Sequence, residues 1–291
     1  MQYIKSHLLQ VGVQSTGAEL SSIRSLQTQQ EYMWDAQPAI WGNHAPVLFP
    51  IVGGLKNGEY IHDGQTYPLP RHGFIRYNTQ VELRAQTESK LTYGLSNNLD
   101  TEKVYPFKFD FVVHFELFDN KLTISHEVHN RDEKEMYFSL GAHPAFKCPL
   151  HEDETYADYY LEFAEVETEK TWLLDRNGLI ETEGPLMLDH TKVLPLTPNM
   201  FDNDALIFKT MRSRRVSLKS HKSEQILTVH YEGWPYLGIW SKPKAPFVCI
   251  EPWLGIADHA DTDQQLSTKF GILSLAPGQS FEAQYTIEIT E

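Results

Sequence analysis

Cysteine, basic charge and long apolar runs are all scarce in this sequence. Its 291 residues include only two cysteines, Cys148 and Cys249, which lie far apart and form no Cys-x-x-Cys motif. This pattern is typical of a reducing compartment and argues against a disulfide-stabilised secreted domain. No stretch approaches the roughly 18 apolar residues of a membrane span, and the N-terminal segment lacks the apolar core of a secretion signal. The sequence therefore predicts a cytoplasmic protein with no membrane partner.

Basic residues are outnumbered, 25 against 39 acidic ones, which gives a formal net charge of −14. Proteins that bind nucleic-acid backbones usually carry a basic patch. The one dense basic segment, residues 212–222, is interpreted as the solvated rim of a hairpin. We therefore expect a small-molecule partner rather than a nucleic acid, and a monomer or homodimer.

Several common catalytic motifs are missing as well. The sequence contains no Gly-x-Ser-x-Gly elbow, no phosphate-binding loop, no Gly-x-Gly-x-x-Gly and no His-Glu-x-x-His. His72, His143, Glu251 and His259 could in principle surround a metal ion, but no close His-x-His pair supports such a site. We therefore expect neither a metal nor a cofactor.

What the sequence does contain is period-two alternation. In residues 107–117 every odd position is large and apolar, which predicts a strand with one buried face. A turn at Asp119-Asn120 leads into a second alternating run, so the two form a hairpin. Further strands are expected at 136–140, 159–163, 205–208, 226–231, 236–240, 247–251 and 281–289. Many short strands with turn residues between them predict an all-β antiparallel sandwich or barrel.

The rest of the chain gives weaker signals. Helical periodicity is poor, and a turn or two of helix is expected only at Ser21–Tyr32 and Pro50–Leu55. The segment Trp34–Gly54, rich in proline and tryptophan, is expected to be an ordered loop near a binding face. No linker-like stretch divides the sequence, which predicts a single domain over residues 1–291.

Three short segments carry the best candidates for chemistry. His72 and Arg76 lie around a glycine after a turn, and their alternative interpretation is a plain surface turn. His143 ends a strand before a proline, which fixes its backbone and suits proton transfer, although it could merely close a loop. Glu251 ends an apolar run where an unpaired charge is costly, so it is either functional or part of a buried ion pair. Trp253 offers a stacking surface for a sugar ring.

Together these segments offer a general acid and a general base at strand ends, which is what opening a hemiacetal ring requires. A glycosidase would need two opposed carboxylates, and Glu251 with Asp202 or Asp204 could supply them.

The segments in their order resemble the aldose 1-epimerase, or galactose mutarotase-like, family, closest to its LacX and hexose-6-phosphate mutarotase-like branch. The resemblance covers nearly the whole chain. It rests on residues 17–20, 45–53, 72–76, 105–107, 141–146, 201–206 and 250–253. It implies a supersandwich of large twisted antiparallel sheets, with the sugar in a cleft on one face.

The resemblance also implies roles for individual residues. Glu251 matches the general base that takes the C1 hydroxyl proton, and His143 matches the general acid that protonates the ring oxygen. His72 matches a second histidine that hydrogen-bonds the sugar, and Asp204, or less well Asp202, matches the acid that holds sugar hydroxyls. The remaining implied contacts to substrate come from Arg76 and Trp253.

The sequence departs from the family pattern after Gly53. Galactose mutarotases carry an arginine shortly after this glycine, whereas here Gly54, Leu55 and Lys56 follow. The contact is then missing or supplied by Arg71, Arg76 or Lys56. The expected function is aldose mutarotation, with a hexose-6-phosphate mutarotase or a non-catalytic sugar-binding module on the same fold as the alternatives.

Overall fold

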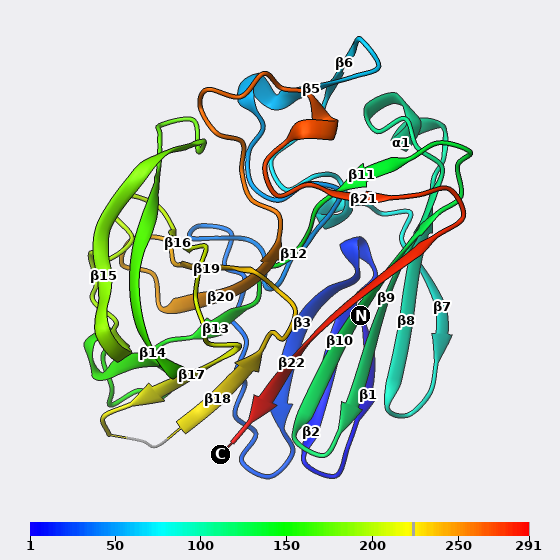
Figure 1. The fold of residues 1–291 in the computed structure, drawn as a ribbon. Helices are drawn as coiled ribbons and strands as arrows, with labels where there is room; N and C mark the ends of the chain where they lie inside the picture. The colour runs from blue at the N-terminus through cyan, green and yellow to red at the C-terminus, as the bar shows by residue number, and fades with distance from the viewer. Residues whose placement is uncertain (223–224, 291) are drawn as a thin grey trace.

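The computed structural model describes residues 1–222 and 225–290 and consists mainly of one large, strongly curved antiparallel sheet. Figure 1 shows its two halves, with β14 and β15 in one and β7 to β10 in the other, joined where β18 pairs with β22. All-β antiparallel architecture was predicted from the alternating sequence, and the structure confirms it.

The strands of the large sheet run in the order β4-β12-β20-β19-β16-β14-β17-β18-β22-β10-β9-β8-β7, with β13 also on β20 and β15 also on β14. Their bounds are β4 Val47–Leu48, β7 Glu82–Gln86, β8 Lys90–Ser96, β9 Phe109–Phe118, β10 Lys121–Asn130, β12 Leu140–Ala142, β13 Ala145–Lys147, β14 Tyr159–Leu174, β15 Ile180–Pro195, β16 Leu206–Phe208, β17 Arg215–Ser220, β18 Gln225–His230, β19 Tyr236–Trp240, β20 Phe247–Leu254 and β22 Ser280–Ile289.

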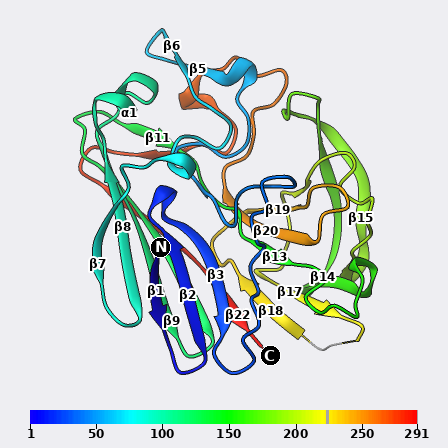
Figure 2. The same cartoon turned by 180° about the vertical axis from the view of Figure 1, so that it is seen from behind.

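A second, three-stranded sheet closes the sandwich. It holds β1 Gln2–Lys5, β2 Leu9–Gln14 and β3 Glu19–Ser25, and it lies against the half of the large sheet that contains β8 to β10 (Figure 2). Val11 and Ile23 from this sheet share one apolar core with Phe111, Phe115 and Ile124 from β9 and β10. The alternation of β9 and β10 places these side chains on a single buried face. Two short antiparallel pairs complete the fold: β5 Glu59–His62 with β6 Gln65–Pro68, and β11 Met136–Phe138 with β21 Leu273–Leu275.

Both helical predictions were wrong. Ser21–Ser25 belongs to β3, where its backbone pairs with β2, and this pairing outweighs weak local helical preference. In Pro50–Leu55 the chain bends at Gly53, which has a φ of +74° and lies against Ala257. A side chain at Gly53 would come within 2.6 Å of Ala257, so the segment follows tertiary contact rather than helical geometry.

The helices that do form are short. α1 spans Leu99–Val104 and begins at Asn98, whose side chain accepts hydrogen bonds from the N–H groups of Asp100 and Thr101 in a capping box. Single 3₁₀ turns occur at Thr16–Ala18, Lys56–Gly58, Ile75–Tyr77, Tyr156–Asp158 and Leu266–Thr268. None of the helices in the described ranges is both long and apolar enough to cross a membrane.

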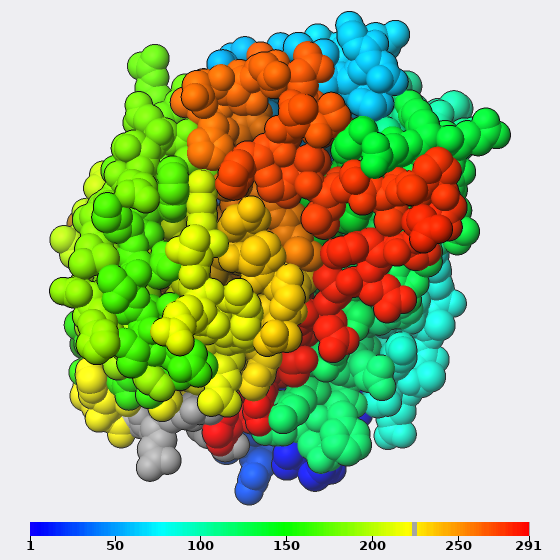
Figure 3. Space-filling model, viewed as in Figure 1, coloured from blue at the N-terminus to red at the C-terminus, as the bar shows by residue number. Residues whose placement is uncertain are grey.

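A buried ion pair holds the segment that follows β20. Lys269 Nζ lies 3.2 Å from Asp258 Oδ1, with both side chains 3% exposed. The other Asp258 oxygen accepts the Lys56 N–H, and the Asp258 N–H donates to Gly54 O. Figure 3 shows this segment, in orange, packed beside the light-blue β5–β6 region. Asp258 therefore ties the chain after β20 to the loop that begins at Gly53.

Candidate active site

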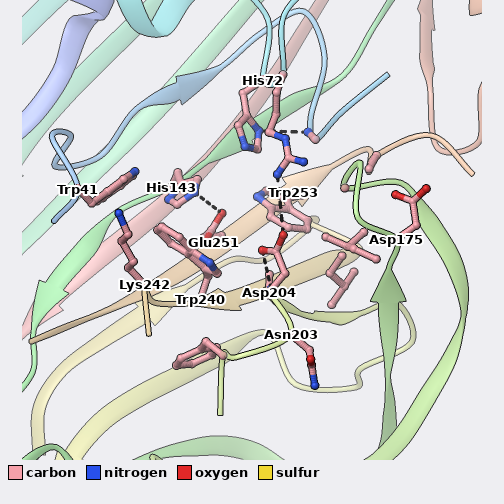
Figure 4. Close-up of a pocket in the computed structure, with 18 of the residues that line it drawn as sticks. Trp41, His72, His143, Asp175, Asn203, Asp204, Trp240, Lys242, Glu251 and Trp253 are labelled. Atoms are coloured by element: carbon pink, nitrogen blue, oxygen red, sulfur yellow. Dashed lines mark hydrogen bonds and ion pairs between the residues drawn. The ribbon is translucent and has the colours of Figure 1, made fainter. Parts of the chain in front are cut away.

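A cavity of about 700 Å³ opens beside the ends of β12, β16, β19 and β20. All seven site residues expected from the sequence line it: Arg71, His72, Arg76, His143, Asp204, Glu251 and Trp253. They come from segments far apart in the chain, and Figure 4 shows the side chains of His72, His143, Asp204, Glu251 and Trp253 around a common space. Trp41 and Gly53 from the Trp34–Gly54 segment, which the sequence predicted to lie near a binding face, also line the cavity. The segment is not a loop throughout, because Val47–Leu48 within it forms β4 and pairs with β12.

The sheet itself brings His143 and Glu251 together. β12 and β13 both pair with β20, with Gly141 opposite Trp253 and Ala145 opposite Cys249. His143 lies in the short connection between β12 and β13, so it falls across the strand from Glu251. His143 Nε2 is 3.2 Å from Glu251 Oε2, and both residues are buried (Figure 4).

Burial sets the proton affinities of this pair. Enclosure in the protein, together with the Asp204 carboxylate, raises the pKa of Glu251 well above its usual range, and the nearby Trp253 indole and Arg76 offset only part of this. Burial, reinforced by the Arg76 guanidinium, lowers the pKa of His143 to about 3. Both shifts disfavour the charged forms. Burial therefore favours the neutral form of each group, a protonated Glu251 carboxyl beside an uncharged His143 imidazole.

His72 is fixed by its neighbours in one neutral form. Its Nδ1 accepts the Gly53 N–H at 3.1 Å, while its own backbone N–H donates to Gly53 O. Burial and the nearby His143 and Arg76 lower the pKa of His72 well below its usual range. An imidazole that accepts at Nδ1 presents an N–H donor at Nε2. The ring stands edge-on to His143, with centroids 5.7 Å apart.

Gly73 makes this position possible. Both His72 and Gly73 adopt positive φ, +68° and +73°. A Cβ on Gly73 would lie 2.1 Å from Phe49 O, so backbone and side chain cannot both fit. Position 73 requires glycine because the turn packs directly against the backbone of Phe49, the residue that follows β4.

Replacing Gly73 with alanine is expected to destabilise the protein and displace His72. Gly58 is the matched control, because it has almost the same φ, +71°, but open space around it. Gly58→Ala should cost about 1–2 kcal/mol for the left-handed backbone alone. Gly73→Ala should cost about 1–3 kcal/mol more through the clash. Urea unfolding of both variants measures the difference, and equal destabilisation would contradict the steric account.

The polar residues on the other side of the cavity form a looser set. Arg71 Nη1 lies 4.0 Å from Asp204 Oδ2, and Arg71 also donates to Asn177 O in the β14–β15 connection. Asp204 has a φ of +78° and its Oδ1 accepts the Ala205 N–H. Asp202 lines the cavity too, but the carboxylate that acts on the pKa of Glu251 is that of Asp204. This proximity favours Asp204 as the acid that faces the reacting groups.

Aromatic rings shape the walls. The Trp253 ring lies where side chains at Gly141 and Gly238 would otherwise be, within 3.0 Å of the Cβ position of each. Trp41 stacks on His143 with ring centroids 5.1 Å apart, and Trp240 meets the same imidazole edge-on at 5.6 Å. These rings cover part of the imidazole and contribute to the burial that lowers its pKa.

Sequence reasoning missed several lining residues, namely Trp41, Asp175, Arg176, Trp240 and Lys242. Trp41 lies in the loop that the sequence did mark as near a binding face. Asp175 and Arg176 come from the β14–β15 connection, whose strands are far longer than the alternating pattern indicated. No local signal marks that connection, because its place at the cavity depends on the twist of the two strands.

Two candidates lie elsewhere. His259 is not part of the cavity lining and packs against Trp172 and Phe270, so it does not lie with His72, His143 and Glu251. Lys56 donates to Thr262 O and does not reach the cavity lining. Of the three residues offered as substitutes for the missing arginine, only Arg71 and Arg76 line the cavity.

Comparison with known proteins agrees with this architecture. The family model described as aldose 1-epimerase matches residues 2–287. The plasmid-encoded protein LacX of Lactococcus lactis is 34% identical over 300 residues, covering 98% of each chain. A galactose mutarotase related enzyme from Lactobacillus acidophilus has a structure with a TM-score of 0.94 at 38% identity, covering 100% of this chain and 97% of that one.

A galactose mutarotase-like protein from Lactobacillus casei gives a TM-score of 0.93 at 29% identity, with both chains fully covered. The match therefore extends over the whole described fold rather than over a motif. Its breadth also supports a mutarotase-type, isomerase function acting on a sugar. The chain belongs to the aldose 1-epimerase family.

Proposed function

We propose that the protein interconverts the α and β anomers of a free aldose by acid–base opening and reclosure of the sugar ring. The observation that carries this proposal is the contact of 3.2 Å between His143 Nε2 and Glu251 Oε2 in the wall of the cavity. The pair combines a carboxyl and an imidazole that hold one proton between them, and ring opening moves one proton on and one proton off the sugar.

Glu251 and His143 together account for every proton that ring opening and reclosure move. The Glu251 carboxylate takes the C1 hydroxyl proton while the C1–ring oxygen bond breaks and the ring oxygen takes a proton from His143. The open aldehyde then rotates about C1–C2. Reclosure on the other face returns the first proton from Glu251 to the C1 oxygen and the second from the ring hydroxyl to His143. His72 contributes a neutral N–H donor toward the sugar, and Asp204, Arg76 and Trp253 hold its hydroxyls and its ring.

The reactive form needs the proton on His143, whereas burial favours it on Glu251. The 3.2 Å contact between His143 Nε2 and Glu251 Oε2 is short enough for the proton to move between the two side chains before reaction. A bound sugar hydroxyl that donates to Glu251 favours the ionised carboxylate and shifts the pair toward this form.

A pair that must hold one proton predicts a bell-shaped pH dependence of kcat/KM. Below the lower macroscopic pKa a second proton adds to the pair, and above the higher one the shared proton is lost. Glu251→Gln and His143→Gln each leave one titrating member, so each residual profile should show at most one limb. A flat profile in the parent protein would count against the assignment.

The activity itself is measured by polarimetry of freshly dissolved α-D-glucose and α-D-galactose. Faster relaxation with the protein than without it, absent in His143→Asn, would support the mutarotase. If no sugar responds but one still binds in calorimetry, the non-catalytic binding module is the better description.

A phosphorylated hexose is the second candidate substrate, favoured by the cations that reach the cavity. Arg71, Arg176 and Lys242 line it, and all three are exposed enough to meet an anion. Arg71→Met with Arg176→Met should then raise KM for glucose 6-phosphate at least tenfold and leave KM for glucose nearly unchanged. Equal effects on both sugars would exclude a phosphate contact at these residues.

A further inference from the structure

We propose that His143, Cys249 and Glu251 form a binding site for a thiophilic divalent cation such as Zn²⁺ or Cd²⁺. Each residue offers one ligand atom, and the three atoms lie within 4.8 Å of one another. All three residues are buried, with Cys249 completely so.

The sheet preorganises this cluster. Cys249 and Glu251 are two residues apart on β20, so their side chains leave the strand on the same face. His143 approaches from the connection between β12 and β13, both of which pair with β20. Two of the three ligands therefore lie on β20, and the third lies in a short connection whose two flanking strands both pair with β20.

The donor set fits a borderline-soft cation. A nitrogen, a thiolate sulfur and a carboxylate oxygen are the ligands that zinc uses, and three protein ligands with one open position are typical of a reactive zinc site. Zinc bonds of about 2.0–2.3 Å place tetrahedral ligand atoms about 3.3–3.8 Å apart. The three ligand atoms, now within 4.8 Å of one another, would have to close to this spacing when a cation binds. His143 and Glu251 line the cavity, so a cation could reach them from it.

The second observation is that two possible ligand atoms of this cluster lack a hydrogen-bond partner. Glu251 Oε1 and His143 Nδ1 are buried and have no hydrogen-bond partner in the described part of the chain. A cation that binds Glu251 therefore breaks no existing bond at Oε1. The Cys249 thiol and the Glu251 carboxyl would each lose a proton to solvent as the cation binds, with no change in oxidation state.

Binding of a cation here has a functional consequence that rests on the proposed function. The same Glu251 and His143 would have to exchange protons with the sugar. Cation and sugar therefore compete, and the cation acts as a reversible inhibitor that a chelator removes.

The test is titration of the full-length protein with Cd²⁺, followed by the ultraviolet thiolate-to-cadmium charge-transfer band. We expect one Cd²⁺ per chain in the parent, and loss of the band with at least a tenfold higher Kd in Cys249→Ala. Cys148→Ala is the matched control, because Cys148 is the other buried free thiol, and it should keep the band. His143→Gln keeps the thiol but removes a ligand, so it should weaken binding even if Cys249→Ala folds poorly.

Absence of the band in the parent, or an equal band in Cys249→Ala, would overturn the site. The optical signal needs no catalysis, so it separates this proposal from the proposed function. A band without any polarimetric activity would leave the cation site standing and refute the mutarotase. Where activity is present, Cd²⁺ should raise the apparent KM for the sugar in the parent and in Cys148→Ala but not in Cys249→Ala.

Discussion

Glu251→Gln is expected to lower kcat for mutarotation by about 10² to 10⁴-fold, the usual contribution of a positioned general acid or base. Glutamine keeps the shape of the side chain but cannot take the C1 hydroxyl proton. Its amide also cannot pass a proton to His143 across the present 3.2 Å contact. Initial rates from polarimetry, corrected for spontaneous mutarotation, measure the loss.

Glu116→Gln is the control for this variant. Glu116 lies on β9 with an exposed side chain, far from the cavity lining, so its replacement should leave kcat unchanged. Near-ultraviolet circular dichroism of both variants checks that the fold is intact. A Glu251→Gln protein that retains more than a tenth of the parent kcat would remove Glu251 from the role of base.

Lys269→Met is expected to lower the free energy of unfolding by about 3–5 kcal/mol, because it leaves the Asp258 carboxylate buried without its cation. The effect should reach the candidate active site as well. Asp258 holds Lys56 and Gly54 through hydrogen bonds, and the neighbouring Gly53 N–H fixes His72. A higher KM, with a smaller change in kcat, should therefore accompany the loss of stability.

Lys90→Met provides the comparison. Lys90 pairs with Glu116 on the exposed face of the sheet, and such surface pairs are worth less than about 1 kcal/mol. Urea unfolding measures both variants under the same conditions. If Lys269→Met unfolds like Lys90→Met, the Asp258–Lys269 pair does not organise the segment after β20.

Much of the strand layout could be predicted from the sequence, because a sheet with one buried face requires apolar and polar residues to alternate along each strand. Residues 107–117 and 281–289 show it clearly, and they are β9 and β22. Prediction failed where local pattern and tertiary contact disagree. β14 and β15 extend through irregular registers that break the alternation, and Ser21–Ser25 is a strand only because β2 lies beside it.

The sequence by itself determined the residue types at the candidate site, since His72, His143 and Glu251 stand in motifs that restrict the local backbone. Only the tertiary structure decided which of them meet. Pairing of β12 and β13 with β20 brings His143 to Glu251 and adds Cys249, while His259 packs elsewhere. Proton affinities were equally invisible in the sequence, because they depend on burial and on charges that distant segments supply.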